Sequence, residues 1–402
     1  MFKSFSSVVR FRRPDFDPVR RRLAKCADIE DLRKVARKML PGGVFDYIDG
    51  GAEGELTLRR NSSAYEELEL HPNVLCDVSA IDTSTTLLGE SLPAPLLLAP
   101  TGFTRIANPQ GELAVARSAG RAGVPYVLST LGTRSIEEVA QVSNGPLWFQ
   151  VYVWKDRGLV RDMIARAEEA GYRAIVVTVD TAVLGRRERD VRRGFTLPPK
   201  IGLGTLVSGA VHPRWSWQLV ANDPITFANV ANRSDINGTS VISLSDYVNS
   251  EFDQALSWQR LDWIREASRL PVVLKGIQRV DDARRAVAEG VAAIALSNHG
   301  GRQLDGAPAP VSLLPRVMDE VGDSIEVICD GGVRRGSDIV KACALGAKAV
   351  MCGRPYLYGL AAGGEPGVDF VVDHLLSGMR RTMALVGRTS VQELTSDLVH
   401  GG

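Results

Sequence analysis

The sequence predicts an α/β fold in which eight parallel strands close into a (β/α)8, or TIM, barrel. One unit recurs, in which an Ala-, Arg- and Glu-rich helix ends at a glycine and a short apolar strand follows; the glycines are Gly123, Gly171, Gly290 and Gly346. Helices that alternate with buried strands are typical of parallel βα units. The predicted strands lie near residues 96–100, 125–129, 147–153, 174–180, 271–275, 292–297, 326–330 and 349–352. An open doubly wound sheet is the weaker alternative, because no G-x-G-x-x-G opens a helix near the N-terminus.

One domain, residues 29–402, is predicted to follow a basic N-terminal tail, residues 1–28. The basic residues of the tail include Lys3, Arg10, Arg12, Arg13, Arg20, Arg21 and Arg22. Residues 29–54 have a helical pattern and precede the first barrel strand. Residues 186–268 separate the fourth and fifth strands, and ordinary βα connections are far shorter, so this segment is predicted to be a functional insertion.

Composition and charge are those of an ordinary globular protein. The 402 residues are 45% hydrophobic and 24% charged, and the formal net charge is +1. Because positive charge is not in excess, we expect no nucleic-acid partner. The five cysteines show no CxxC and no metal-ligand spacing, which predicts a reduced, cytoplasmic protein without a metal site. The sequence shows no secretory signal and no apolar run of the ~18 residues that suggest a membrane span.

The most informative segment follows the sixth predicted strand and reads Ser-Asn-His-Gly-Gly-Arg-Gln-Leu-Asp over residues 297–305. His299 can move a proton near neutral pH. Arg302 can hold a carboxylate through a two-pronged hydrogen bond, and the glycines let a ligand approach the backbone. A lone histidine is more often structural, but these residues together at a strand end predict a site that takes a proton from a carboxylate-bearing substrate.

Polar residues also follow other predicted strands, and the active site of a TIM barrel lies at the C-terminal ends of its strands. Alternation places Gln150 and Tyr152 on one face of the third strand, and Thr178 and Asp180 on one face of the fourth. Polar groups inside a barrel need partners. Lys275 closes a β-branched run, where a core lysine is unexpected. The loops after the last two strands carry glycines and arginines of the kind that cradle a phosphate, at Gly331, Gly332, Arg334, Gly353 and Arg354.

These segments resemble those of the FMN-dependent enzymes that oxidise L-2-hydroxy acids, a family that includes glycolate oxidase, lactate oxidase, L-lactate dehydrogenase and mandelate dehydrogenase. The resemblance runs from about Ile29 to Leu398, and residues 297–305 carry it most specifically. It implies that the protein binds FMN without a covalent link and oxidises a small L-2-hydroxy acid. L-lactate is the expected substrate, and mandelate is the second candidate.

The resemblance assigns roles in the substrate site. It implies that His299 takes a proton and that Asp180 pairs with it and stabilises its protonated form. The expected substrate contacts are Tyr47, Tyr152, Arg187, His299 and Arg302, with Tyr47 and the two arginines on the carboxylate. Removal of the α-hydrogen as a proton, and removal of the hydroxyl proton with hydride transfer, use the same residues and both stay open.

The resemblance also implies a cofactor site. The residues expected to bind FMN are Pro100, Thr101, Gly102, Ser129, Gln150, Thr178, Lys275, Ser297, Asp330, Gly332, Arg334, Gly353 and Arg354. Asp330 is expected on the ribityl chain, and the glycines and arginines that follow it on the phosphate. The charge of Lys275 would stabilise negative charge on the reduced flavin ring.

Two positions bear on the electron acceptor and the substrate. Gly102 stands where the family's oxidases usually carry Ala, which favours a dehydrogenase that passes electrons to a membrane quinone. Leu131 stands where several oxidases have a bulky aromatic, so we expect room for side chains larger than that of glycolate.

An oxygen-using oxidase is the alternative within the family. A non-redox FMN isomerase is the alternative from another class, and residues 297–305 weigh against it. We expect a homotetramer or larger assembly.

Residues 196–222 of the insertion are expected to contact the inner face of the cell membrane. They contain no Asp or Glu, and Trp215 and Trp217 suit a headgroup boundary. The stretch is too short and too broken by Pro and Gly to cross a bilayer. It resembles the membrane-contacting segment of the family's mandelate dehydrogenase, including a His-Pro-Arg-Trp-Ser core. Packing against the barrel or a neighbouring subunit is the alternative.

Overall fold

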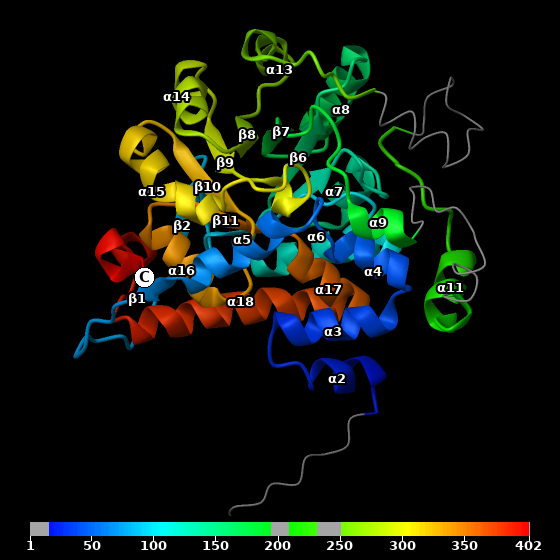
Figure 1. The fold of residues 1–402 in the computed structure, drawn as a ribbon, viewed down its shortest axis with the longest axis horizontal. Helices are drawn as coiled ribbons and strands as arrows, with labels where there is room; N and C mark the ends of the chain where they lie inside the picture. The colour runs from blue at the N-terminus through cyan, green and yellow to red at the C-terminus, as the bar shows by residue number, and fades with distance from the viewer. Residues whose placement is uncertain (1–15, 194–208, 231–250, 402) are drawn as a thin grey trace, which may run out of the picture.

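The computed structural model describes residues 16–193, 209–230 and 251–401, and its centre is a closed parallel barrel (Figure 1). The order of strands around the barrel is β10-β11-β4-β5-β6-β7-β8-β9. Their bounds are β4 Leu96–Leu98, β5 Tyr126–Ser129, β6 Leu147–Tyr152, β7 Ala174–Thr178, β8 Val272–Ile277, β9 Ala293–Leu296, β10 Glu326–Asp330 and β11 Ala349–Cys352. The predicted strands and the (β/α)8 fold class are confirmed.

Helices cover the outside of the barrel, and glycines end several of them as the repeat predicts. The covering helices are α6 Gly111–Ala122, α7 Ile136–Val142, α8 Arg157–Glu169, α14 Val280–Ala288, α15 Pro310–Val321, α16 Gly336–Ala344, α17 Arg354–Gly363 and α18 Glu365–Leu385. Gly123 caps α6 with a φ of 68°. This left-handed conformation returns the chain to the next strand at little steric cost, because glycine has no Cβ.

The strands are buried on both faces. In β4, Leu97 belongs to a cluster that fills the barrel interior with Val127 and Trp148, whereas Leu96 and Leu98 pack with the helices outside. A hairpin, β2 Thr85–Leu87 and β3 Glu90–Leu92, adds Leu87 and Leu92 to the interior cluster. It therefore covers the interior core away from the C-terminal ends of the strands, which leaves those ends for a site.

Helices precede the barrel, and one of them, α4, brings Tyr47 to the C-terminal ends of the barrel strands. They are α2 Pro18–Leu23, α3 Ile29–Met39, α4 Gly42–Asp49 and α5 Leu56–Glu66. The helical segment predicted for residues 29–54 is confirmed as α3 and α4. The region expected to be a tail contains α2, whose Leu23 is buried. A two-stranded sheet, β1 Leu68–Leu70 with β12 Val399–Gly401, ties the chain after α5 to the C-terminus.

The insertion lies between β7 and β8, and α11 lies at the edge of the molecule in Figure 1. Its described elements are α9 Glu188–Arg193, α11 Pro213–Ala221, η2 Trp258–Arg260 and α13 Asp262–Glu266. Residues 196–208 of the expected membrane segment lie outside the described residues. Trp215 Nε1 donates a hydrogen bond to the Ile106 carbonyl at 2.9 Å, whereas Trp217 is 72% exposed. In the described part of the chain, no helix combines the length and apolarity needed to cross a bilayer.

We expect Gly336→Ala to lower the free energy of unfolding by about 1–3 kcal/mol, the usual cost of overpacking. Gly336 begins α16, and a Cβ there would lie 2.6 Å from the Leu375 carbonyl of α18 and still closer to the Met379 amide. Gly401→Ala is the control, because nothing lies within 4 Å of its added Cβ. Thermal unfolding of the FMN-loaded enzymes measures the difference. Equal stability would show that α16 and α18 are not in close contact.

Candidate active site

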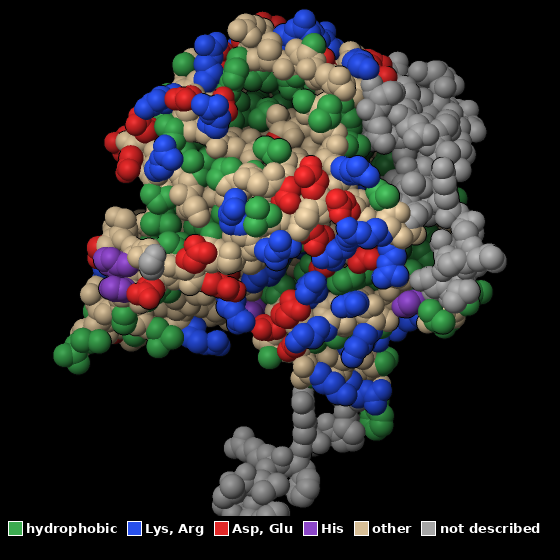
Figure 2. All heavy atoms as spheres, viewed as in Figure 1, with side chains coloured by type: hydrophobic (Ala, Val, Ile, Leu, Met, Phe, Trp, Pro, Cys, Tyr) green, Lys and Arg blue, Asp and Glu red, His purple; other side chains and the backbone are tan. Residues whose placement is uncertain are grey.

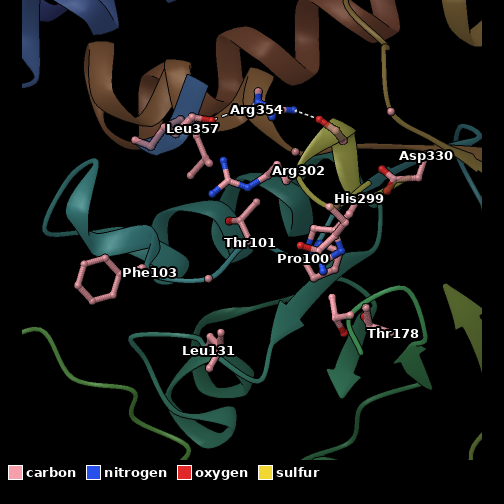
Figure 3. Close-up of a pocket in the computed structure, with 18 of the residues that line it drawn as sticks. Pro100, Thr101, Phe103, Leu131, Thr178, His299, Arg302, Asp330, Arg354 and Leu357 are labelled. Carbon is pink, nitrogen blue, oxygen red and sulfur yellow. Dashed lines mark hydrogen bonds between the residues drawn. The ribbon is translucent and has the colours of Figure 1, made fainter. Parts of the chain in front are cut away.

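A cavity of about 520 Å³ lies at the C-terminal ends of the barrel strands and collects most of the predicted site residues (Figure 3). The predicted residues that line it are Tyr47, Pro100, Thr101, Gly102, Gln150, Tyr152, Thr178, Arg187, Lys275, His299, Arg302, Asp330, Gly332, Arg334, Gly353 and Arg354. Ser129, Asp180 and Ser297 stand behind this lining, and each contacts a residue within it.

His299 and Asp180 form an ion-pairing dyad. His299 Nδ1 lies 3.0 Å from Asp180 Oδ1, and the Asp180 side chain is only 3% exposed. Burial alone would raise the pKa of Asp180, but attraction to His299 and Lys275 outweighs it and lowers that pKa below its usual value. Asp180 is therefore an anion at neutral pH. With Nδ1 directed at this carboxylate, Nε2 is the ring nitrogen left to accept a proton.

A left-handed turn presents His299 to the cavity. His299, Gly300 and Gly301 have φ values of 57°, 63° and 73°. A Cβ on Gly300 would lie 2.8 Å from Arg354 Nη1, and one on Gly301 would lie 2.6 Å from the Leu58 amide nitrogen. Both positions therefore favour glycine by their positive φ, and Gly301 is also required by space, because the close atom is Leu58 backbone. The turn holds the histidine in a strained conformation of the kind that concentrates at functional sites.

Arg302 faces the same cavity without a carboxylate partner. Its Nη1 donates to the carbonyl oxygens of Tyr47 at 2.7 Å and Gly50 at 3.2 Å. The Tyr47 ring packs against two guanidinium groups, with its centroid 5.1 Å from Arg302 Cζ and 5.3 Å from Arg187 Cζ. Removal from water and the nearby Arg187 lower the pKa of Arg302 to about 9. Arg302 is thus still a cation at neutral pH and can bind an anion.

Arg354, at the start of α17, is held in a similar way. It donates to the carbonyl oxygens of Ile48, Gly50 and Gly300 at 3.1, 2.8 and 2.8 Å. Burial lowers the pKa of Arg354. Neither Arg354 nor Arg302 forms an ion pair with any residue that the structure describes. Figure 3 shows the two arginines on one side of the cavity with Asp330 and His299 beside them.

Buried polar side chains form two connected networks beneath the cavity. In the first, Ser129 Oγ donates to Gln150 Oε1 at 2.9 Å, and Gln150 Nε2 donates to Thr178 Oγ1 at 2.9 Å. In the second, Lys275 Nζ lies 2.7 Å from Asp330 Oδ2 and donates to Ser297 Oγ at 2.9 Å.

Lys275 is a cation within the second network. Burial lowers its pKa, but the anions Asp330 and Asp180 raise it further, and the net pKa is above the usual lysine value. The cavity wall therefore offers the polar groups of Gln150 and Thr178 to a polar ring, and the positive charge of Lys275 lies beside them. With the unpaired Arg354 for a phosphate, this set fits FMN.

Sequence reasoning missed most of the apolar lining of the cavity. Phe103, Phe227 and Phe252 line it together with Leu131. The Phe252 ring stands edge-on to Tyr152 at 5.2 Å between centroids. Phe227 and Phe252 belong to the insertion, where no periodic pattern or motif shows which residues turn inward. Leu131 alone among these four residues was identified, through its position in the resemblance.

Comparison with known proteins agrees with this geometry. The chain is 44% identical over 374 residues to an L-lactate oxidase of Nostoc sp., which covers 92% of this chain and 97% of that protein. It is 42% identical over 370 residues to an L-lactate dehydrogenase of Caulobacter sp., covering 92% and 97%. The solved structure of the monotopic membrane protein (S)-mandelate dehydrogenase matches with a TM-score of 0.90 at 39% identity, covering 94% of this chain and all of that one.

The family match extends over nearly the whole barrel. The FMN-dependent dehydrogenase family matches residues 36–401, which include the cavity, the dyad and both unpaired arginines. The chain belongs to the FMN-dependent dehydrogenases that act on 2-hydroxy acids.

Proposed function

We propose that the protein oxidises a small L-2-hydroxy acid, preferentially L-lactate to pyruvate, and passes the electrons to a membrane quinone. The observation that carries the proposal is the position of the Asp180–His299 dyad beside the unpaired Arg302 in one cavity. A base and a carboxylate-binding cation that face the same space suit a substrate with a carboxylate next to the carbon that is oxidised.

Each residue has a defined part in the proposed reaction. Arg302 and Arg187 bind the substrate carboxylate, and Tyr47 fixes the spacing between the two cations. His299 Nε2 takes a proton from the substrate, and the anionic Asp180 stabilises the resulting imidazolium. FMN, when bound, supplies a two-electron acceptor. Lys275, held protonated by Asp330, would stabilise negative charge on the reduced flavin ring.

Tyr152 supplies a hydroxyl donor. Burial and the Asp180 charge raise the pKa of Tyr152 well above its usual value, so its hydroxyl stays protonated at neutral pH. A protonated phenol can donate to a substrate oxygen but cannot act as the base, which leaves that role to His299.

Mandelate is the second candidate substrate, and the similarity to (S)-mandelate dehydrogenase favours it. Phe103, Leu131 and Phe227 line the cavity, and such an apolar lining suits an aliphatic substituent such as the methyl group of lactate. We favour lactate because relatives named for lactate recur at 41–44% identity over most of the chain. We further propose a homotetramer or larger assembly, as predicted from the sequence.

We expect L-lactate to reduce the bound flavin anaerobically, and His299→Gln to slow this reduction by about 10²–10⁴-fold, the usual contribution of a general base. FMN content should not change, because His299 makes no contact with the phosphate side of the cavity. The exposed His71 provides the matched control, His71→Gln, which should keep the wild-type rate. Stopped-flow absorbance measures the rate. Reduction of His299→Gln at the wild-type rate would assign the base elsewhere.

We propose that the surroundings of Gly102 influence which electron acceptor reoxidises the flavin. We expect Gly102→Ala to raise the ratio of oxygen turnover to quinone-analogue turnover. The added Cβ would lie 3.0 Å from Leu131 Cβ, so the methyl group displaces Leu131 slightly and alters packing beside the flavin. Steady-state assays with both acceptors measure the ratio, with Gly401→Ala as the control. An unchanged ratio would remove Gly102 as an argument for a dehydrogenase.

We also propose that the protein docks on the inner face of the cell membrane through residues 196–222. The exposed apolar residues of the described part are Val211, Trp217, Leu219 and Val220. Figure 2 shows basic side chains gathered over α2, α4 and α9, on the side of the view where α11 lies. Apolar groups next to cations suit an anionic lipid surface. Trp215 instead anchors α11 to the barrel through Ile106, so the helix is held with its other face outward.

We expect replacement of Trp217 and Val220 by Gln to reduce flotation with anionic liposomes while leaving flavin reduction by L-lactate unchanged. These side chains are 72% and 81% exposed, so their loss does not disturb the core. Leu385→Gln, which removes a 70% exposed apolar side chain from α18, is the control and should float like wild type. Equal flotation of all three proteins would exclude α11 as the membrane contact.

A further inference from the structure

The insertion returns to the active site at Phe227. This side chain is 4% exposed and lines the cavity. Its ring centroid lies 5.7 Å from that of Phe103, and Phe103 stands edge-on to Tyr47 at 6.5 Å. The three rings form a continuous wall that starts at the residue between the carboxylate-binding arginines and ends at the insertion.

This wall lies where the 2-substituent of a 2-hydroxy acid is expected, which is the group on the reacting carbon besides the carboxylate and the hydroxyl. The arginines fix the carboxylate, and His299 fixes the carbon that is oxidised with its hydroxyl. The 2-substituent is then directed to the part of the cavity away from these groups. Figure 3 shows Phe103 and Leu131 there, on the side opposite Arg354 and Asp330. The lining at this side is apolar, with Ile106, Leu131 and Phe227 beside Phe103.

The backbone around Phe227 is fixed from the barrel. Arg105, which is 6% exposed, donates through Nη2 to the Asp223 carbonyl at 2.6 Å and through Nη1 to the Pro224 carbonyl at 3.3 Å. The Ala228 amide donates to the Gly132 carbonyl at 3.1 Å. Arg105 lies in η1 Thr104–Ile106, directly after the Pro100–Phe103 stretch of the cavity wall. One short stretch of chain thus lines the cavity and anchors the segment that carries Phe227.

We propose that Phe227 is a specificity-determining residue that limits the size of the 2-substituent, and that Arg105 is the residue that positions it. This inference rests on the proposed oxidation of L-2-hydroxy acids. Short aliphatic substituents pack against the Phe227 ring. A phenyl group attached directly to the reacting carbon clashes with that ring. The insertion therefore selects the substrate in addition to its proposed role at the membrane.

The test compares two substrates on each FMN-loaded protein in detergent. The measured quantity is kcat/KM for L-mandelate divided by kcat/KM for L-lactate. Because it is a ratio taken on one preparation, it is independent of any loss of folded enzyme. We expect Phe227→Ala to raise the ratio by about tenfold or more, the usual effect of reshaping an apolar pocket, and Phe227→Leu to raise it less. Trp217→Ala, on the exposed face of α11, should leave the ratio unchanged.

The role of Arg105 is tested by the same ratio. Arg105→Gln should shift it in the same direction, Arg105→Lys should restore it in part, and combining Arg105→Gln with Phe227→Ala should add little further. A ratio unchanged in Phe227→Ala, with wild type still reduced by L-lactate, would overturn this inference and leave the proposed function intact. A wild-type flavin that no L-2-hydroxy acid reduces would overturn both.

Discussion

Two guanidinium groups without carboxylate partners organise the active site. Arg302 and Arg354 are both held by carbonyl oxygens of residues 47–50, and neither forms an ion pair with a described residue. Carbonyl dipoles position a cation but do not cancel its charge. The cavity therefore favours bound anions, and these two cations lie where the substrate carboxylate and the cofactor phosphate are proposed to bind. The helices before the barrel thus support the site, although the barrel strands supply most of its side chains.

Other charges of the site are paired, and Arg187 pairs with Asp190 at 2.6 Å. Asp180 balances His299, and Asp330 balances Lys275. Removing one partner of such a buried pair typically costs about 3–5 kcal/mol, because it strands the other charge. The folded-state pKa of Asp180 is lowered, so its pairing stabilises the fold above the unfolded pKa and is lost only as pH falls through the lowered value. The dyad is therefore preserved across the neutral range in which His299 must exchange a proton.

The barrel and the polar residues at its strand ends could be predicted from local sequence patterns, whereas Tyr47, Arg187 and the roles of the other site residues were predicted only through the family resemblance. Apolar runs between helix-ending glycines predict the strands, and barrel geometry brings the residues at their ends together. Phe227 and Phe252 could not be predicted, since their burial depends on how an aperiodic insertion folds back. The β2–β3 hairpin was missed because its turn residues, Leu88 and Gly89, have positive φ values of 53° and 77° but lack the Asn or Asp that usually marks such a turn. Ser129 and Ser297 were predicted to bind the cofactor, and the structure places them behind the residues that line the cavity.

Arg302 is proposed to present an unpaired positive charge to the substrate carboxylate. This proposal is tested most directly by binding pyruvate and its neutral amide, pyruvamide, to the oxidised enzyme and following the flavin absorbance. We expect pyruvate to bind at least about tenfold more tightly than pyruvamide, since charge-assisted hydrogen bonds are worth about 1.5–3 kcal/mol. We also expect Arg302→Met to remove most of this difference. Equal binding of the two ligands by the wild-type enzyme would contradict the proposal.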